Sequence, residues 1–470
     1  MMTPPLATMT IGGSPAVAEG TFGVVNPATG EVFAEAPDCT PAQLDAAFDA
    51  AAKAHRDWRR DDDRRREMLR DAASALKAAI GDLAPILVAE QGKPLKDATG
   101  ELVGTYVWMK YYADLELPRE VIQDDDRAFV EVVRRPLGVV AAITPWNYPV
   151  SLAAWKFAPA LRAGNTVVLK PSPYTPLSTL ALGEVLAGVL PAGVLNVVSG
   201  KDPLGAWMTS HPVPRKISFT GSVATGKLVA AAAAPDLKRT TLELGGNDPA
   251  IVLDDADPAE IADELFWGAF QNNGQVCSAI KRLYVPERLH DDIVEALAEK
   301  ARSVVVGDGM AEGVQLGPIN NRPQFERVAQ LVADAIARGA TAVAGGRARD
   351  GAGYFYEPTI LTDLSDGTRI VDEEQFGPAL PVITYRDVDD VIDRANATNF
   401  GLSGSVWSTD PERATALAKR LECGTAWVNT HLALSPFQPF GGAKWSGIGV
   451  ENGPWGLYGF TEIQAVYQAR

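Results

Sequence analysis

The sequence predicts an α/β fold built around a largely parallel sheet. The first observation is a series of short apolar runs that each end in glycine or proline, at 138–145, 165–171, 195–200, 216–221 and 240–246. The second is the set of helix-forming stretches that separate them, at 152–163, 175–190 and 224–234. This alternation predicts parallel strands covered by helices on both faces, with ligands bound at the carboxyl ends of the strands.

The residues that precede this sheet are expected to be helical from 40 to 112. Thr40, Pro41 and Gln43 combine an N-cap, a proline at the first helical position and a capping-box glutamine. The alanine-rich, charged stretch that follows is interpreted as a solvated helix face without a function of its own.

A second α/β unit is expected to begin near residue 247. Its predicted strands are the runs at 250–255, 281–287, 380–387, 404–408 and 424–430. A helix that starts at Asp257 leads toward a loop that contains Cys277. Two parts, 114–136 and the tail after 452, lack regular periodicity, although the extended run at 462–468 could pair with another strand.

Composition narrows the class of protein. With 470 residues and 46% hydrophobic content the chain is long enough for two or three domains. A net charge of −16 argues against nucleic acid as a partner. No apolar run reaches the length of a membrane span, and the N-terminus lacks a signal-peptide pattern. Three widely spaced cysteines and four histidines predict no disulfides, no metal site and a cytoplasmic location.

Four residues with chemically useful side chains follow predicted strand ends: Asn147, Lys170, Ser222 and Glu243. The segment 221–228 resembles a phosphate-binding P-loop except at its last position, where leucine replaces the magnesium-binding hydroxyl. Phosphoryl transfer is therefore not expected. A glycine-flanked turn into a helix can still bind a pyrophosphate, and it can equally be an ordinary strand-to-helix turn.

Three residues are candidates for covalent chemistry, and each has a structural alternative. Cys277 lies in a polar loop, so it is either a nucleophile or a small buried core residue. Glu243 ends an apolar strand, where desolvation raises the pKa of a carboxyl and suits a general base, although a glutamate there can also pair with nearby backbone. Asn147 lies in a segment with two prolines and two aromatic residues. Its amide is either a donor to a developing oxyanion or a turn side chain that satisfies backbone groups.

Together these segments resemble the aldehyde dehydrogenase superfamily over nearly the whole chain. The resemblance is carried by ordered motifs: VNPATGE at 25–31, PWNYP at 145–149, KPSPYTP at 170–176, FTGSVATG at 219–226, LELGGN at 242–247, GQVCSA at 274–279, EEQFGP at 373–378 and PFGG at 439–442. It implies that Cys277 attacks the aldehyde, that Asn147 and the Cys277 backbone amide hold the oxyanion, and that Glu243 activates water to hydrolyse the thioester without a metal.

The same resemblance places the cofactor. Lys170 matches the lysine that contacts the adenosine ribose. It implies that Gly221, Ser222 and Gly226 lie in the turn that approaches the pyrophosphate. Glu374 and Phe376 are implied to position the nicotinamide ribose and ring, and Pro145 and Trp146 to line the same cleft. NAD-preferring members often carry glutamate at the position of Pro173, where it binds the ribose hydroxyls. NAD is the favoured cofactor, and NADP is possible because no carboxylate at Pro173 repels a 2′-phosphate.

The implied substrate is a small aldehyde in an apolar tunnel lined by Tyr148, Trp155, Val276, Ser278 and Phe440. The resemblance further implies three parts: a Rossmann-type cofactor domain (1–113 and 137–246), a catalytic α/β domain (247–445) and an oligomerisation hairpin with a C-terminal strand (114–136 and 446–470). A homodimer or homotetramer is expected, with no nucleic-acid or membrane partner.

Three alternatives compete with hydrolytic aldehyde oxidation. One is a cofactor-independent thiol esterase or acyltransferase that uses Cys277. Another is a dehydrogenase specific for a semialdehyde, although the sequence shows no clear basic pair for a second carboxylate. The third is a non-catalytic binding descendant, against which the intact set of Cys277, Glu243 and Asn147 argues.

Overall fold

The computed structural model describes residues 7–470, and its first large sheet has eight strands in the order β19-β11-β10-β7-β8-β9-β1-β2. The inner strands β7 to β11 are paired in parallel, while β1, β2 and β19 join as antiparallel edges. The strands are β1 (Met9–Ile11), β2 (Ser14–Ala16), β7 (Val139–Ile143), β8 (Thr166–Lys170), β9 (Leu195–Val197), β10 (Lys216–Thr220), β11 (Arg239–Glu243) and β19 (Gly447–Ile448).

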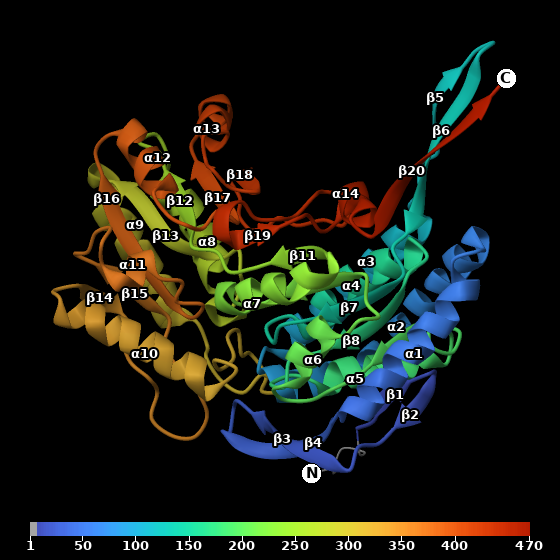
Figure 1. The fold of residues 1–470 in the computed structure, drawn as a ribbon. Coiled ribbons are helices and arrows are strands. Elements are labelled where there is room, and N and C mark those ends of the chain that lie inside the picture. The colour runs from blue at the N-terminus through green and yellow to red at the C-terminus, as the bar shows by residue number, and fades with distance from the viewer. Residues whose placement is uncertain (1–6) are drawn as a thin grey trace.

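Helices cover both faces of this sheet (Figure 1). They are α1 (Pro41–Trp58), α2 (Asp62–Gln91), α3 (Leu95–Asp114), α4 (Pro149–Arg162), α5 (Leu177–Ala187), α6 (Leu204–Ser210) and α7 (Val223–Ala233), followed by the short η1 (Ala234–Asp236). The capping box predicted for α1 is present, with Thr40 and Gln43 bonded reciprocally. The predicted α/β class and its parallel sheet are thus confirmed.

Helix α2 is the one helix in residues 7–470 that is long and apolar enough, by length and composition alone, to cross a membrane, which the sequence pattern did not anticipate. Its Leu69, Leu76, Leu83 and Leu87 are at most 2% exposed and belong to the core of the first unit. This helix contacts α3, α4 and α5, so its apolar surface is used within the fold.

The second large sheet has seven strands in the order β14-β15-β16-β13-β12-β17-β18, all parallel except β14. They are β12 (Asp248–Val252), β13 (Ile280–Pro286), β14 (Thr341–Ala344), β15 (Thr359–Thr362), β16 (Ala379–Tyr385), β17 (Ser403–Trp407) and β18 (Thr425–Val428). The helices around it are α8 (Pro258–Phe270), η2 (Gln271–Gly274), η3 (Glu287–Leu289), α9 (His290–Ser303), α10 (Arg322–Ala337), α11 (Arg369–Asp372), α12 (Val388–Asn396) and α13 (Pro411–Ala418).

Two smaller sheets complete the fold. The strands β3 (Gly20–Asn26) and β4 (Glu31–Asp38) form a hairpin, and β5 (Glu120–Asp124), β6 (Ala128–Pro136) and β20 (Thr461–Ala469) form a three-stranded sheet that projects from the body (Figure 1). Before β20 the chain forms η4 (Lys444–Ser446), β19 and α14 (Gly453–Tyr458). Within the tail assigned to the hairpin, β19 instead pairs with β11. Residues 1–6 of the predicted cofactor domain lie outside the described residues.

Candidate active site

A cavity of about 870 Å³ lies where the carboxyl ends of β7, β10 and β11 meet the second α/β unit. Eight of the residues singled out in the sequence line it: Pro145, Trp146, Asn147, Gly221, Ser222, Cys277, Glu374 and Phe376. The other candidates do not: Lys170, Gly226, Glu243, Tyr148, Trp155, Val276, Ser278 and Phe440. Half of the predicted site residues therefore line one cavity at the carboxyl ends of parallel strands, where the fold class places ligands.

The loop before Cys277 is held in an unusual conformation. Asn272, Asn273 and Gly274 all have positive φ, at 51°, 57° and 73°, which is costly for residues other than glycine. The side chain of Gln275 supports this turn by donating to the Asn272 carbonyl at 2.9 Å and accepting from the Asn320 amide at 2.8 Å. The loop thus presents Cys277 to the cavity from a fixed backbone.

The thiol of Cys277 is partly exposed because it faces the cavity. Burial raises the pKa of the Cys277 thiol to about 12, and the negative charges of Glu243, Asp248 and Glu374 also raise it. The positive charge of Lys281 acts to lower this pKa. A nearby positive charge is therefore needed to give this thiol thiolate character. Its backbone N–H donates to no protein acceptor in the described part of the chain.

Asn147 is 3% exposed, and its side-chain amide donates to the Gln275 carbonyl at 3.0 Å. An amide has two N–H groups, so this bond fixes its orientation and leaves a second donor. The Asn147 carbonyl in turn accepts from the Lys93 ammonium at 2.9 Å and from Asn272 at 3.1 Å. The loop that contains Cys277 and the turn that contains Asn147 therefore hold one another across the boundary between the two α/β units.

A buried ion pair between Lys93 and Glu101 stabilises the turn that contains Asn147. Lys93 contacts Glu101 at 2.6 Å, and its ammonium lies 3.7 Å from the centre of the Tyr148 ring. Glu101 also accepts from the amides of Val150 and Ser151 at 3.0 and 3.1 Å. Helix α4 has no side-chain cap of its own, so this carboxylate from α3 serves as its cap.

Glu243 is 3% exposed, and neither of its carboxylate oxygens has a partner among the described residues. Burial raises its pKa well above the ordinary value, and the negative charge of Glu451 raises it further, while Lys156 opposes both. Lys156 and Glu451 form a buried ion pair at 2.7 Å. An uncompensated carboxyl with a raised pKa beside a thiol is suited to accept a proton near neutral pH.

Another part of the cavity wall is formed by the turn between β10 and α7, to which the resemblance assigned the cofactor pyrophosphate. Ser222 caps α7 by accepting from the Thr225 amide at 3.2 Å, so the positive end of this helix opens at the cavity. Gly226 does not face the cavity. A Cβ there would lie 2.5 Å from the Leu244 side chain, so this glycine allows α7 to pack closely on the end of β11.

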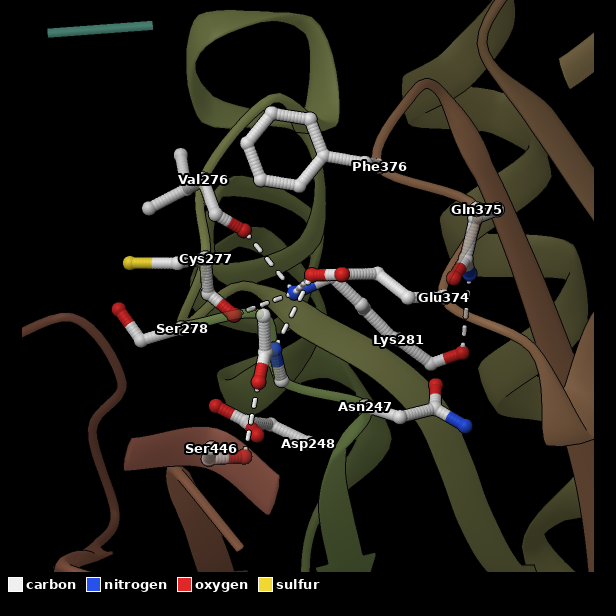
Figure 2. A network of polar contacts seen from close by, with 12 residues as sticks. Asn247, Asp248, Val276, Cys277, Ser278, Lys281, Glu374, Gln375, Phe376 and Ser446 are labelled. Atoms are coloured by element: carbon white, nitrogen blue, oxygen red, sulfur yellow. Dashed lines mark hydrogen bonds and ion pairs between the residues drawn. The ribbon is translucent and has the colours of Figure 1, made fainter. Parts of the chain in front are cut away.

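Opposite this turn lie Glu374 and Phe376. The Phe376 ring packs edge-on against Trp146, with 5.2 Å between ring centres. Glu374 accepts from the Gly246 amide at 3.1 Å and contacts the ammonium of Lys281 at 3.4 Å (Figure 2). The absence of a side chain at Gly245 is required here, because a Cβ would lie 2.1 Å from the Glu374 carboxylate.

Lys170 lies at the end of β8 and is 6% exposed, with its ammonium 3.2 Å from the Pro171 carbonyl. Burial lowers the pKa of Lys170 to about 8, although the negative charges of Asp202 and Asp38 act to raise it. Pro173 lies three residues further along the chain and carries no charge.

An apolar cluster packs against Cys277. Trp155 stacks on Trp108 and packs edge-on against Phe440, with 5.6 Å between ring centres in each pair. This cluster, which we call the aromatic cluster, also includes Leu152, Leu402, Leu434, Tyr148 and Cys277 itself. Three of the five predicted tunnel residues thus pack in one group with the thiol. Val276 and Ser278 are 7% and 0% exposed and flank the thiol in sequence.

Sequence patterns missed several residues that hold the site. These are Lys93, Glu101, Lys156, Lys281, Gln324, Arg327 and Glu451. Gln324 and Arg327 line the cavity, and both donate to carbonyls of the 374–376 segment. The signal that could have found Lys156 and Lys281 is a charged residue inside an otherwise apolar helix or strand, since such a residue must be paired; Lys93 lies between α2 and α3 and carries no such signal. No group of three or more possible metal ligands occurs within residues 7–470.

Comparison with known proteins identifies the family to which the chain is similar. A family model described as the aldehyde dehydrogenase family matches residues 16–466. Phenylacetaldehyde dehydrogenase from Pseudomonas fluorescens is 39% identical, with 97% of this chain and 95% of that protein aligned. The NADP+-type succinate-semialdehyde dehydrogenase of Escherichia coli is also 39% identical, over 94% of this chain and 93% of that protein. The structure of an aldehyde dehydrogenase from Bacillus cereus in complex with NAD+ superposes with a TM-score of 0.97 at 34% identity, covering 99% of this chain and 97% of that one.

Proposed function

This chain belongs to the aldehyde dehydrogenase family, and we propose that it oxidises an apolar aldehyde to a carboxylic acid through a thioester on Cys277. The chain is an oxidoreductase that acts on aldehydes with NAD(P)+ as acceptor. The observation that supports the covalent course is the proximity of three groups: Cys277 and Asn147 line one cavity, and the buried Glu243 lies close enough to the thiol for its charge to disfavour the thiolate. The Cys277 thiol, the Asn147 amide and the Glu243 carboxyl come from three separate segments of the chain.

In the first half of the reaction, the Cys277 thiolate adds to the aldehyde carbon and the carbonyl oxygen becomes an oxyanion. The second N–H of the Asn147 amide and the backbone N–H of Cys277 are the donors for that oxygen. NAD(P)+ would be held by Gly221, Ser222, Glu374 and Phe376, and would supply a positive charge and an acceptor for the hydride lost from the aldehyde carbon. Collapse of the oxyanion then leaves a thioester.

In the second half, Glu243 takes a proton from water while the water oxygen attacks the thioester carbon. The same two donors stabilise the second tetrahedral state, because its oxyanion forms at the same atom. The bond from carbon to sulfur breaks, the thiolate returns to Cys277 and the acid leaves. The Glu243 carboxyl, whose oxygens have no hydrogen-bond partner within residues 7–470, is available for this proton.

The cavity fits a dinucleotide. The N-terminus of α7 with Gly221 and Ser222 suits a pyrophosphate, whereas Trp146, Glu374 and Phe376 suit a nicotinamide riboside. Lys170 would contact the adenosine ribose and Gly226 would contribute only through packing. We infer NAD+ as the working cofactor, with NADP+ also accepted because Pro173 carries no carboxylate to repel a 2′-phosphate.

The aromatic cluster supports an apolar substrate, aliphatic or aromatic. The nearby ammonium of Lys93 is already paired with Glu101, so it is not free to bind a second carboxylate of a semialdehyde. Tyr148, Trp155 and Phe440 would line the substrate tunnel, with Val276 and Ser278 beside the thiol. This favours an apolar aldehyde over the semialdehyde named for one relative.

A kinetic panel tests this function. Enzyme is mixed with an aromatic, an aliphatic and a dicarboxylic semialdehyde, each with NAD+ and with NADP+, and reduced cofactor is followed by absorbance. Turnover of the apolar aldehydes that is lost in Cys277→Ala supports the proposal. Ester cleavage by Cys277 without any cofactor-dependent aldehyde turnover would instead identify a thiol esterase.

We further infer a homodimer or homotetramer in the cytoplasm. The projecting sheet exposes Val121, Ile122, Ile463, Val466 and Tyr467, each at least 41% accessible, and apolar surface of this kind is typical of an interface. The three cysteines are unpaired, as expected in a reducing compartment. Light scattering coupled to gel filtration measures the oligomeric state.

A further inference from the structure

Lys281 is a buried cation directly behind the nucleophile. It is the second residue of β13, four positions after Cys277, and its side chain is 2% exposed. Its ammonium donates to the Val276 carbonyl at 3.0 Å and to the Cys277 carbonyl. Figure 2 shows that the Cys277 sulfur points away from this ammonium, so Lys281 acts on the backbone of the nucleophile and does not touch the reacting atom.

The third contact of the same ammonium is the Glu374 carboxylate, at 3.4 Å. An ammonium has three N–H donors, so these three contacts satisfy it fully. The same carboxylate oxygen also accepts from the Gly246 backbone amide at 3.1 Å. The neighbouring Gln375 also donates to the backbone carbonyl of Lys281 at 3.1 Å. Two loops that are distant in sequence are therefore tied to one residue (Figure 2).

We propose that Lys281 is a positioning residue that couples the Cys277 loop to Glu374, so that one buried charge sets both the nucleophile and the cofactor-binding carboxylate. This inference rests on the proposed function, in which Cys277 is the nucleophile and Glu374 contacts the nicotinamide ribose. A purely structural lysine would need only to satisfy its own charge. Lys281 does so with the nucleophile's two carbonyls and with a carboxylate that lines the cavity.

The charges that face the thiol define what the loss of Lys281 changes. Glu243 at the end of β11, Asp248 at the start of β12 and Glu374 disfavour the thiolate, and Lys281 is the cation among these neighbours that favours it. Replacing Lys281 by methionine keeps the length of the side chain and removes the charge and the donors. The thiolate becomes harder to form, and the Glu374 carboxylate loses one of its two anchors.

The direct test is the rate of alkylation of Cys277 by iodoacetamide in Lys281→Met, without cofactor, followed by mass spectrometry of the Cys277 peptide from pH 7 to 10. A shift of about one unit in the thiol pKa makes alkylation about tenfold slower at each pH below the midpoint. The KM for NAD+ rises about tenfold in the same variant because Glu374 is no longer held.

Lys238→Met is the matched control. Lys238 is another buried lysine, with its side chain 1% exposed, and it donates to the Thr209 carbonyl and pairs with Asp236 at the opposite end of β11 from Glu243. Its loss removes a buried charge and lowers stability without changing the alkylation profile. A similar profile shift in both lysine variants would overturn the proposal.

Glu374→Gln provides a readout of opposite sign. It removes a negative charge near the thiol, so alkylation becomes faster, while the KM for NAD+ still rises. If Lys281→Met folds poorly, the double variant Lys281→Met/Glu374→Gln leaves no unpaired carboxylate, and its alkylation is compared with Glu374→Gln alone. An unchanged profile and an unchanged KM in these lysine variants would refute the coupling. Turnover that survives Cys277→Ala would instead refute the proposed function.

Discussion

Replacement of Asn147 by alanine separates oxyanion stabilisation from every other role of the site. The wild-type amide donates one N–H to the Gln275 carbonyl at 3.0 Å, and the second N–H is the proposed donor to the oxyanion. After the substitution the Gln275 carbonyl still accepts from Asn272 at 3.3 Å, so no buried acceptor is orphaned. We therefore expect a loss of only about 1–2 kcal/mol in the free energy of unfolding.

The expected kinetic loss is much larger. Removal of one of two oxyanion donors lowers kcat by about 10²- to 10³-fold, or roughly 3–4 kcal/mol. Both tetrahedral states place negative charge on the same oxygen, so this loss appears whichever half of the reaction limits turnover. The charges around the Cys277 thiol are unchanged, and alkylation of Cys277 should stay within about threefold of wild type.

Steady-state kinetics with an apolar aldehyde and thermal unfolding together check this prediction. Asn196→Ala is a suitable control, because Asn196 is a fully buried amide on β9 that donates to the Gly193 carbonyl at 2.9 Å, away from the cavity. It should lose stability and keep its kcat. An Asn147→Ala enzyme with a kcat within about threefold of wild type would show that the amide does not stabilise the oxyanion.

Three further predictions concern pH, cofactor and backbone. Burial and the negative charge of Glu451 both raise the pKa of Glu243. Removing that charge in Glu451→Gln therefore lowers this pKa and moves the acid limb of the kcat profile to lower pH. A shift to higher pH would contradict the assignment of Glu243 as the base. Pro173→Glu introduces a carboxylate and should reduce kcat/KM with NADP+ by at least about tenfold while sparing NAD+, as two parallel titrations would show. Gly274→Ala combines a φ of 73° with a Cβ 2.3 Å from the Gly377 carbonyl, so chemical denaturation should show a loss of at least about 2 kcal/mol, and an unchanged midpoint would refute the strain.

Strand and helix patterns predicted the central part of both sheets because buried parallel strands are continuous apolar runs. The expected strands at 138–145, 216–221 and 240–246 correspond to β7, β10 and β11. The pattern did not reveal β3 or β5, which lie in small sheets. In β5 the neighbouring apolar residues Val121 and Ile122 are both exposed, so burial does not alternate there. In β3 exposed Thr21 and Gly23 do alternate with buried Phe22 and Val24, but the alternating stretch is short.

The residues that could act chemically were predictable because each follows a strand end or lies in a recognisable motif. Their supports were not, because a buried ion pair depends on contacts between distant segments. Lys156 and Glu451 are 295 positions apart and meet only in the fold. Gly226 was assigned to the pyrophosphate turn from its place in the motif. In the structure it lies in α7 and packs against the Leu244 side chain.

Direct observation of the acyl-enzyme would test the central proposal, covalent catalysis by Cys277 with hydrolysis by Glu243. Glu243→Gln is mixed with excess NAD+ and an apolar aldehyde, quenched in acid within one turnover and examined by intact-protein and peptide mass spectrometry. Since only the base for hydrolysis is removed, we predict a burst of about one reduced cofactor per site, with the acyl mass on the Cys277 peptide. Steady turnover at the wild-type rate, or a burst without an acyl group on Cys277, would contradict the proposed course.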